Sequence, residues 1–372
     1  MAEQAATGSD ETGGGLFQPF SMRGLELENR IVMSPMSRHR ASPKGLHHPL
    51  ATLYYRQRAS AGLIISEGTQ VSETAKGFPG IPGIYRPEHV ETWREPIAAV
   101  HDEGGRIFIQ LWHCGRIAHG SHLPEGQMPV APSAIRAEDG MVMLDDLSFA
   151  KPDMPRALET REVEALVEDH VHAARMALAA GADGVEIHAA NGYGAAQFLC
   201  DRTNQRTDRY GGSPVKRCRF VIETAEAIAS AIGADKVGIR LSPVSTYQDA
   251  WDSDPTALYG VLLPALSMLD LGYVHMVEGS PGTSRDPSGF DFAGARRLFD
   301  GPWIVNNLYD RALAEAALAR GDADLVAFGL PFLANPDLVR RFREHRDLNP
   351  VEKETLYGGG EKGYTDYPFF AG

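Results

Sequence analysis

Eight short apolar runs that alternate with helix-like segments predict an α/β fold, a single (β/α)8 or TIM barrel. A chain of 372 residues suits one such barrel with insertions. The alternative is an open doubly wound sheet, in which a GxGxxG motif usually follows the first strand; no such motif follows the first run here. The eight runs are RIVMSP (30–35), GLIISEG (62–68), RIFIQLW (106–112), DGVEIHA (183–189), KVGIRLS (236–242), YVHMVEG (273–279), WIVNN (303–307) and DLVAFG (324–329).

The segments between these runs have helical periodicity. The clearest are residues 161–181, 217–233 and 310–321. The first of them ends with Gly181, and a glycine at that place is typical of a helix C-terminus.

The widest gap between consecutive runs lies between Trp112 and Asp183 and is longer than one helix needs. We interpret residues 128–158 as an insertion after the third strand that forms a two-stranded lid over the active face. A passive surface decoration is the alternative. Residues 1–15, rich in Gly, Thr and Glu, are expected to be a disordered tail, which leaves one domain over residues 16–372.

The composition excludes several classes of protein. The net charge of −13 argues against a nucleic-acid-binding surface, which needs a basic stripe. No apolar run approaches the roughly 20 residues of a membrane span, and the N-terminus lacks the order of a signal peptide. Three cysteines without a CxxC motif do not suggest a disulfide scaffold. We therefore expect a cytoplasmic protein with no membrane or nucleic-acid partner.

Alternation along the strands predicts a ring of polar side chains inside the barrel. If the apolar side of each strand faces the outer helices, then Gln110, Glu186, His188 and Arg240 point inward, near the carboxyl ends of three strands. This is where TIM barrels carry their active sites. The structural alternative is that Arg240 and Glu186 form an ion pair in the barrel core. For Gln110 and His188 a structural and a functional interpretation both remain open.

Other chemistries of TIM barrels fit the sequence less well. A Schiff-base enzyme needs a strand lysine, and the one lysine in a strand run is Lys236, at its entry. The segment WHCGRIAHGSH (112–122) holds three His and one Cys at irregular spacing, so we expect turn or lid residues there and no metal site. A glycosidase needs two opposed carboxylates; Glu67 and Glu278 are candidates, but alternation places Glu67 on the outward face.

The end of the fourth run and the loop after it carry His188, Asn191 and Tyr193 within six residues. All three side chains form hydrogen bonds, and together they suggest a grip on one oxygen atom of a ligand.

Several motifs, in order and spacing, resemble the Old Yellow Enzyme family of flavin-dependent ene-reductases. The resemblance extends from about Leu16 to Pro368 and is greatest to the class of pentaerythritol tetranitrate and N-ethylmaleimide reductases. The segments that carry it are LENRIVMSPMSRHRA, YYRQRASAGLIISEGTQVS, IFIQLWHCGRIAH, GVEIHAANGYGAAQFL, NQRTDRYGGS, VGIRLSP, FLANPDL and YGGGEKGYTDYP.

The resemblance implies a noncovalently bound FMN that NADPH or NADH reduces. It implies reduction of the C=C bond of α,β-unsaturated carbonyl or nitro compounds, with a hydride from flavin N5. The expected partner is a small activated alkene, and the expected assembly is a monomer or homodimer. FMN-dependent isomerisation or nitrate-ester reduction is the alternative within the family.

The resemblance also assigns the substrate side of the site. His188 and Asn191 would hydrogen-bond the carbonyl or nitro oxygen of the substrate, and Tyr193 would donate a proton to the α-carbon. Trp112 and Tyr364 would form walls of the substrate pocket.

Six further residues are expected at the flavin ring. Ser37 would place a hydroxyl near flavin O4, where close relatives usually have Thr. The pyrimidine edge of the isoalloxazine would contact Gln110 and Arg240. The face of the ring would lie against Pro35, Met36 and Gly68.

Two departures from the family concern the phosphate of FMN. The family usually has FGR at the end of the eighth strand and NNGYD after the seventh, whereas this chain has Leu330 and Leu308 at the Arg and Gly positions. The backbone N–H groups of Asn307, Leu308, Gly329 and Leu330 remain as possible phosphate donors. The departures leave open a barrel that binds a ligand but little flavin.

Overall fold

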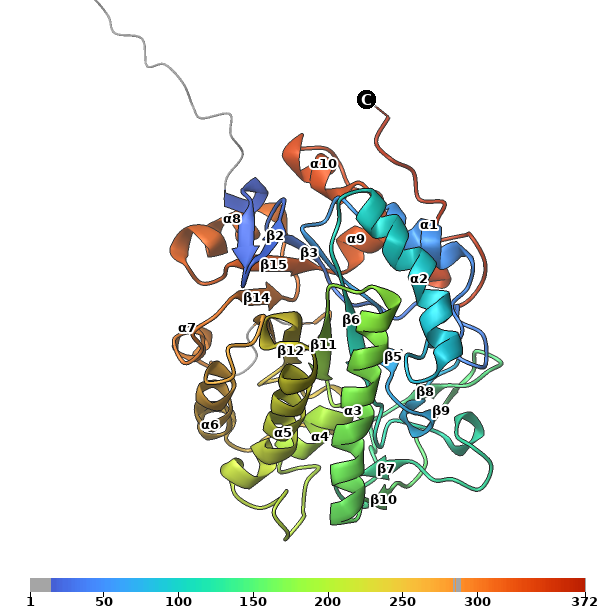
Figure 1. The fold of residues 1–372 in the computed structure, drawn as a ribbon, viewed down its shortest axis with the longest axis vertical. Helices are drawn as coiled ribbons and strands as arrows, with labels where there is room; N and C mark the ends of the chain where they lie inside the picture. Colours follow the sequence, from blue (N-terminus) through green and yellow to red (C-terminus); the bar gives the residue numbers. More distant parts are fainter. Residues whose placement is uncertain (1–14, 284, 286–288, 372) are drawn as a thin grey trace, which may run out of the picture.

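Eight parallel strands close into a barrel that helices surround, in a computed structural model that describes residues 15–283, 285 and 289–371 (Figure 1). Strand pairing follows the order β11-β12-β13-β14-β15-β3-β4-β6, and pairing of β6 with β11 closes the ring. Each strand lies within one of the eight predicted runs, so the TIM-barrel prediction is confirmed. The strands are β3 (Ile31–Met33), β4 (Leu63–Ile65), β6 (Ile107–Trp112), β11 (Gly184–Ala189), β12 (Val237–Leu241), β13 (Tyr273–Val277), β14 (Trp303–Asn306) and β15 (Leu325–Phe328).

The helices form the outer layer. The three clearest predicted helices are all present, as α3, α5 and α8. The first of these ends at Gly181, whose φ of 105° is left-handed, as expected for a glycine at a helix C-terminus. The α-helices are α1 (Leu50–Arg56), α2 (Pro87–Asp102), α3 (Thr160–Ala180), α4 (Gly194–Leu199), α5 (Pro214–Ile232), α6 (Pro255–Ser267), α7 (Phe292–Arg296), α8 (Arg311–Arg320), α9 (Leu330–Ala334) and α10 (Leu338–Arg343).

The core has two layers, as alternation along the strands predicted. On β6, Ile107, Ile109 and Leu111 pack outward with the helices, while Phe108 packs inside the barrel. The amino-terminal end of the barrel is filled by apolar side chains, including those of a hairpin formed by β1 (Phe20–Met22) and β2 (Leu25–Leu27). Because this end is apolar and filled, the polar side chains of the interior lie toward the opposite, carboxyl end.

The insertion between β6 and α3 contains two small sheets. β7 (Val130–Ala131) pairs in parallel with β10 (Arg156–Ala157), and β8 (Val142–Met143) pairs antiparallel with β9 (Phe149–Ala150). We predicted one two-stranded element, and the structure has two. Whether the insertion acts as a lid stays a prediction.

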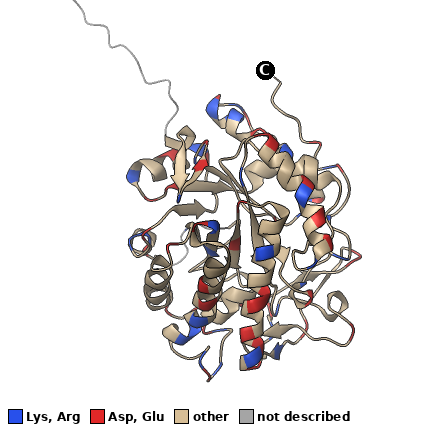
Figure 2. Cartoon of the chain, in the orientation of Figure 1, with Lys and Arg blue, Asp and Glu red and all other residues tan. Residues whose placement is uncertain are grey.

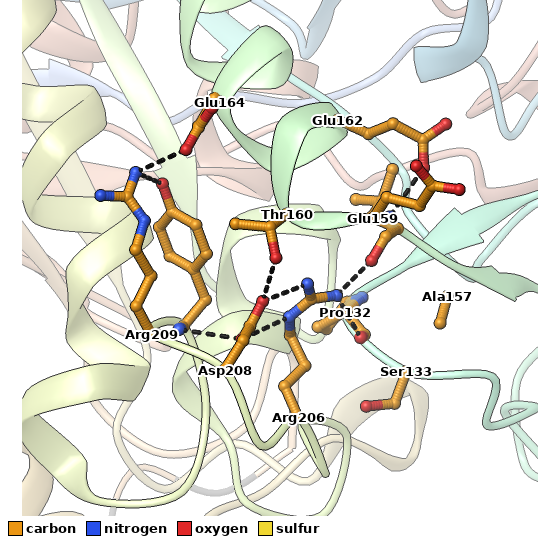
Figure 3. A network of polar contacts seen from close by, with 12 residues as sticks. Pro132, Ser133, Ala157, Glu159, Thr160, Glu162, Glu164, Arg206, Asp208 and Arg209 are labelled. Carbon is orange, nitrogen blue, oxygen red and sulfur yellow. Dashed lines mark hydrogen bonds and ion pairs between the residues drawn. The ribbon is translucent and has the colours of Figure 1, made fainter.

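A buried arginine ties both ends of this insertion to the barrel (Figure 3). Arg206 donates hydrogen bonds to the carbonyl oxygens of Pro132 and Leu158 and two to the carboxylate of Asp208. Thr160, at the start of α3, donates to the same carboxylate at 2.7 Å. The hydrogen bonds from Arg206 hold the pKa of Asp208 well below its usual range. The NQRTDRYGGS motif is therefore an anchor for the insertion.

Acidic and basic residues occur together on the outer helices (Figure 2). None of the helices that the structure describes is long and apolar enough to cross a membrane. The expected tail falls almost wholly on residues 1–14, which lie outside the described residues, while Gly15 begins a short 3-10 helix, η1 (Gly15–Phe17). The expected domain boundary stays a prediction.

Candidate active site

A cavity of about 490 Å3 lies at the carboxyl ends of the barrel strands, and we call it the central cavity. Because the strands are parallel, side chains that follow different strands meet at this one end. The predicted site residues that line it are Pro35, Met36, Ser37, Gly68, Gln110, Trp112, His188, Asn191, Tyr193, Arg240 and Leu330. Most of the expected site is thus brought together, from six barrel strands far apart in the sequence.

Glu186 is fully buried in the barrel, and two side chains satisfy its carboxylate. Nε2 of Gln110 donates to Oε1 at 2.7 Å, and Nδ1 of His275 donates to Oε2 at 2.8 Å. Burial lowers the pKa of His275, so its imidazole is neutral. The suggested pairing of Glu186 with Arg240 is wrong: the carboxylate hydrogen-bonds an amide and an imidazole instead.

Arg240 has a different partner. Its Nη2 donates to Oδ1 of Asn306 at 2.9 Å, while Nε is buried and has no hydrogen-bond partner among the described residues. In TIM barrels, side chains of one interior layer come from alternate strands. Arg240 and Asn306 belong to β12 and β14, and Glu186 and His275 belong to β11 and β13, which explains both pairings. An arginine with a free donor therefore faces the cavity.

His275 and Asn306 were missed in the sequence, although a signal for both was present. Each stands two residues after a side chain that points into the barrel, Tyr273 and Ile304. Applying alternation to the sixth and seventh strands, as was done for the third to fifth, would have found them.

The end of β11 and the loop after it direct the side chains of His188, Asn191 and Tyr193 into the central cavity. Asn191 and Gly192 have φ values of 55° and 75°, and these two left-handed residues reverse the chain before Tyr193. The backbone N–H of Asn191 donates to Oγ of Ser242 at 2.8 Å, which fixes the turn to β12. Oδ1 of Asn191 is buried without a hydrogen-bond partner among the described residues. The side chain of Asn191 thus lines the central cavity with an acceptor that the described residues leave unused.

His188 is a neutral donor. Burial, reinforced by the positive charge of Arg240, lowers its pKa well below the usual value. Its Nδ1 accepts a hydrogen bond from the backbone N–H of Ala190 at 3.3 Å. The neutral ring therefore carries its hydrogen on Nε2.

Tyr193 lies beside His188, with ring centroids 5.4 Å apart and planes at 77°. Burial raises the pKa of Tyr193 well above its usual value, so the hydroxyl keeps its proton. Trp112 packs edge-to-face on Tyr193 at 4.9 Å and is stacked near His188 at 6.1 Å. The indole fixes the positions of both rings.

Apolar side chains form the outer wall of the central cavity. They come from the loop after β5 (Thr69–Gln70), from the insertion and from the C-terminal segment, and they are Phe78, Met141, Met143, Phe149, Leu356 and Tyr357. The outer part of the cavity therefore favours an apolar ligand.

Tyr364 does not line this cavity, so the expectation that it forms a wall of the substrate pocket is wrong. Its ring is buried, stacked on Tyr54 with centroids 4.2 Å apart, and the guanidinium of Arg40 lies 4.4 Å from the ring centre. Nη2 of Arg38 donates to the carbonyl oxygen of neighbouring Gly363 at 2.6 Å. The C-terminal segment is thus bound against α1, and Tyr357 of the same segment reaches the cavity instead.

The backbone expected beneath a flavin lies at the cavity wall. A Cβ on Gly68 would come within 2.6 Å of the Trp112 ring, so this position requires glycine. Pro35, Met36 and Ser37 follow β3 and border the same space.

Of the four residues expected at the phosphate, one lines the central cavity and three do not. Leu330 lines the central cavity, and its side chain is half exposed. Leu308 is also half exposed, with a left-handed φ of 53°. Asn307 is buried, and its side chain donates to the carbonyl oxygens of Glu278 and Ser280. Asn307, Leu308 and Gly329 are not among the residues that line the cavity.

The described residues contain no group of three or more His, Cys, Asp or Glu side chains placed to hold a metal ion. The cysteines at positions 114, 200 and 218 are free thiols.

A TIM barrel with a cavity at its carboxyl end is the architecture of many enzymes and does not by itself define the chemistry. Residues 15–349 match the family model described as "NADH:flavin oxidoreductase / NADH oxidase family". The chain belongs to this family and, by its relatives, to the Old Yellow Enzymes within it. It is therefore an enzyme that uses a flavin and a nicotinamide cofactor.

Relatives cover nearly the whole chain. A putative 12-oxophytodienoate reductase 4 of Oryza sativa subsp. japonica is 42% identical over 359 residues, 95% of this chain and 93% of the relative. Morphinone reductase in complex with tetrahydroNAD is 45% identical, covers 96% of this chain and 98% of its own, and has a TM-score of 0.91. The Old Yellow Enzyme homologue from Zymomonas mobilis is 40% identical, covers 96% and 100%, and has a TM-score of 0.92.

Proposed function

We propose that this enzyme is an NADPH- or NADH-dependent ene-reductase for α,β-unsaturated carbonyl or nitro compounds. The observation that carries the proposal is the convergence of His188, Asn191 and Tyr193 on the central cavity, which Gln110 and Arg240 also line. Two donors for one oxygen and one acid beside them are what reduction of an activated alkene requires.

The inner part of the cavity fits the ring system of FMN. Arg240 offers a buried donor, Nε, that no described residue uses, and Gln110 is held in one orientation by Glu186. Pro35, Met36 and Gly68 would border the ring and Ser37 would reach its edge. When bound, FMN supplies hydride transfer from the nicotinamide to the alkene.

His188 and Asn191 act on the activating oxygen of the substrate. A neutral imidazole with its hydrogen on Nε2 donates one hydrogen bond, and the amide of Asn191 donates the other. Negative charge develops on this oxygen as the alkene accepts hydride, so both bonds strengthen during the reaction. The rigid turn at Asn191 holds the second donor in place.

Tyr193 supplies the proton. Because burial raises its pKa well above the usual value, the hydroxyl holds its proton near neutral pH and gives it up only to a strong base. The α-carbon becomes such a base once the β-carbon has accepted hydride.

The phosphate side fits FMN less well than the ring side. Leu330 and Leu308 place apolar, half-exposed side chains where a cation and a glycine would favour a phosphate. These leucines favour the second candidate function, a barrel that binds a ligand but holds little flavin.

The test is a three-step spectroscopic experiment on the purified protein. We expect a flavin absorption spectrum, its bleaching by NADPH or NADH under anaerobic conditions, and its return on addition of an activated alkene such as 2-cyclohexenone, with the saturated ketone as product. A positional isomer of the alkene, formed without any nicotinamide, would instead indicate isomerisation. Flavin that is absent and cannot be added back would contradict the proposal in favour of the second candidate.

A further inference from the structure

The loop that carries Tyr193 packs directly against a second loop of the cavity wall, residues 245–250. A Cβ on Gly192 would lie 2.5 Å from the carbonyl oxygen of Tyr247 and 3.0 Å from Cβ of Gln248. Gln248 is buried and lines the central cavity together with Tyr193. The close approach of the two loops thus holds the Gln248 side chain beside the expected proton donor.

The backbone of Gln248 is strained. Gln248 and Asp249 have φ values of 61° and 54°, in the left-handed region that costs a non-glycine residue roughly 1 kcal/mol or more. Arg116, itself 1% exposed, holds them there: its Nη2 donates to the carbonyl oxygens of both residues, at 2.9 Å for Gln248. Strain that a buried guanidinium maintains at a cavity wall indicates a side chain whose placement matters.

The same arginine is linked to the Tyr193 loop. The backbone N–H of Arg116 donates to Oε1 of Gln197 at 3.0 Å, and Nε2 of Gln197 donates to the carbonyl oxygen of Gly192 at 2.8 Å. Gln197 is fully buried. One Arg–Gln pair therefore fixes the relative positions of the loops that carry Gln248 and Tyr193.

Gln248 and Tyr193 line the same cavity from adjoining loops, which brings the amide of Gln248 within reach of the Tyr193 hydroxyl. Burial is the main influence on Tyr193 and raises its pKa, while hydrogen bonding from the Gln248 side chain works in the opposite direction. An amide N–H that donates to a phenol oxygen occupies a lone pair of that oxygen. The hydroxyl hydrogen must then point elsewhere, and the cavity is the open direction.

We propose that Gln248 is a positioning residue for Tyr193, which it orients by donating to the phenol oxygen so that the hydroxyl hydrogen points into the central cavity. Arg116 is the group that holds Gln248 in reach. The proposal rests on the proposed function in one respect, the role of Tyr193 as proton donor.

The kinetic test is a double-mutant cycle. Gln248→Met keeps the length of the side chain and removes the donor, and we expect alkene reduction to slow by about tenfold while reduction of the flavin by NADPH is unchanged. In a Tyr193→Phe background the same substitution should have no further effect. An equal loss in both backgrounds would overturn the proposal. Gln205→Met, at an exposed glutamine outside the cavity, is the control.

A second measurement does not depend on turnover. In protein that carries 3-fluorotyrosine, the 19F resonance of Tyr193 is identified as the one that is missing from the Tyr193→Phe variant. The dependence of its chemical shift on pH reports the titration of Tyr193. We expect Gln248→Met to shift this resonance and to raise the Tyr193 pKa, and Gln248→Asn, which suits the left-handed backbone but is too short, to do the same. An unchanged resonance and titration in both variants would overturn the proposal. If the Gln248 variants show the shift but the wild-type enzyme reduces no alkene, only the proposed function is contradicted.

Discussion

Gln110 and Glu186 form a hydrogen bond of 2.7 Å between neighbouring strands, below the cavity where the flavin ring would lie. They are opposite each other in the pairing of β6 with β11. Because Nε2 of Gln110 is used in this bond, its Oε1 faces the other way, and the orientation of the amide is set from inside the barrel. This buried contact thus prepares an acceptor at the candidate site.

The first prediction concerns this contact. Glu186→Ala would leave the buried donors of Gln110 and His275 without their acceptor, and we expect the free energy of unfolding to fall by about 3 kcal/mol. Urea denaturation followed by circular dichroism measures it. Glu186→Gln, which keeps one acceptor oxygen, should lose less. Equal and small losses in both variants would show that water replaces the carboxylate.

The sequence was sufficient for the barrel because its strands are short, apolar and regularly separated. Alternation also placed Gln110 and Arg240 inside correctly. It could not decide which inward groups meet, because contacts across the barrel depend on the stagger of the strands. Glu186 therefore accepts a hydrogen bond from His275, on the next strand but one, whereas sequence reasoning suggested Arg240 as its partner.

The wall of the cavity was harder to predict than its floor. Tyr357 and Tyr364 belong to one irregular segment, and no periodicity distinguishes the one that reaches the cavity. The choice is made by Arg38 and Arg40, whose guanidinium groups bind backbone carbonyls of that segment. Such long-range contacts leave no pattern in the sequence.

The second prediction concerns Tyr193. Tyr193→Phe removes the proton but keeps the ring against Trp112, so reduction of the flavin by NADPH should be nearly unchanged. Alkene reduction should slow by ~10²-fold or more for substrates that need enzymatic protonation. Stopped-flow absorbance separates the two steps. Slowing of both steps together would indicate a structural role, and Tyr85→Phe is the control for loss of a hydroxyl elsewhere.

The third prediction concerns His188 and Asn191, the two proposed hydrogen-bond donors to the substrate oxygen. His188→Ala with Asn191→Ala removes both donors, and p-hydroxybenzaldehyde should bind the flavin-loaded protein at least about tenfold more weakly. The long-wavelength charge-transfer absorbance of the complex should disappear with it. Titration of the phenol into both proteins measures the affinity. Unchanged affinity in the double variant would show that His188 and Asn191 do not hydrogen-bond the ligand oxygen.

The fourth prediction concerns acid stability. Burial lowers the pKa of His170, on α3, to about 4, whereas an unfolded histidine has a pKa of about 6.5. As the pH falls below 6.5, the unfolded chain binds a proton that the folded chain does not, so stability is lost with falling pH. The contribution at pH 5 is about 2 kcal/mol relative to pH 8.

His170→Gln should therefore reduce the difference in unfolding free energy between pH 8 and pH 5, whatever its effect at pH 8. The exposed His172→Gln on the same helix is the control and should keep the wild-type difference. An identical pH dependence in all three proteins would show that His170 does not drive the acid loss.

The last prediction concerns the phosphate loops. The arginine usual in the family is Leu330 here, and loss of a charge-assisted contact to a phosphate costs about 1.5–3 kcal/mol, roughly one to two powers of ten in affinity. Leu308 adds a side chain on left-handed backbone, where glycine would relieve strain and allow close approach. We therefore expect wild-type protein to lose part of its FMN during extensive dialysis. Leu330→Arg with Leu308→Gly should retain more.

The measurement is the ratio of flavin to protein absorbance after dialysis. Leu53→Arg, at an exposed leucine of α1 outside the central cavity, adds the same charge elsewhere and should leave the ratio at its wild-type value. Because the isoalloxazine contacts are the same in all variants, a gain confined to the double variant would assign the difference to the phosphate. Full occupancy in the wild type, with no gain, would mean that another group of this chain neutralises the phosphate in place of the arginine.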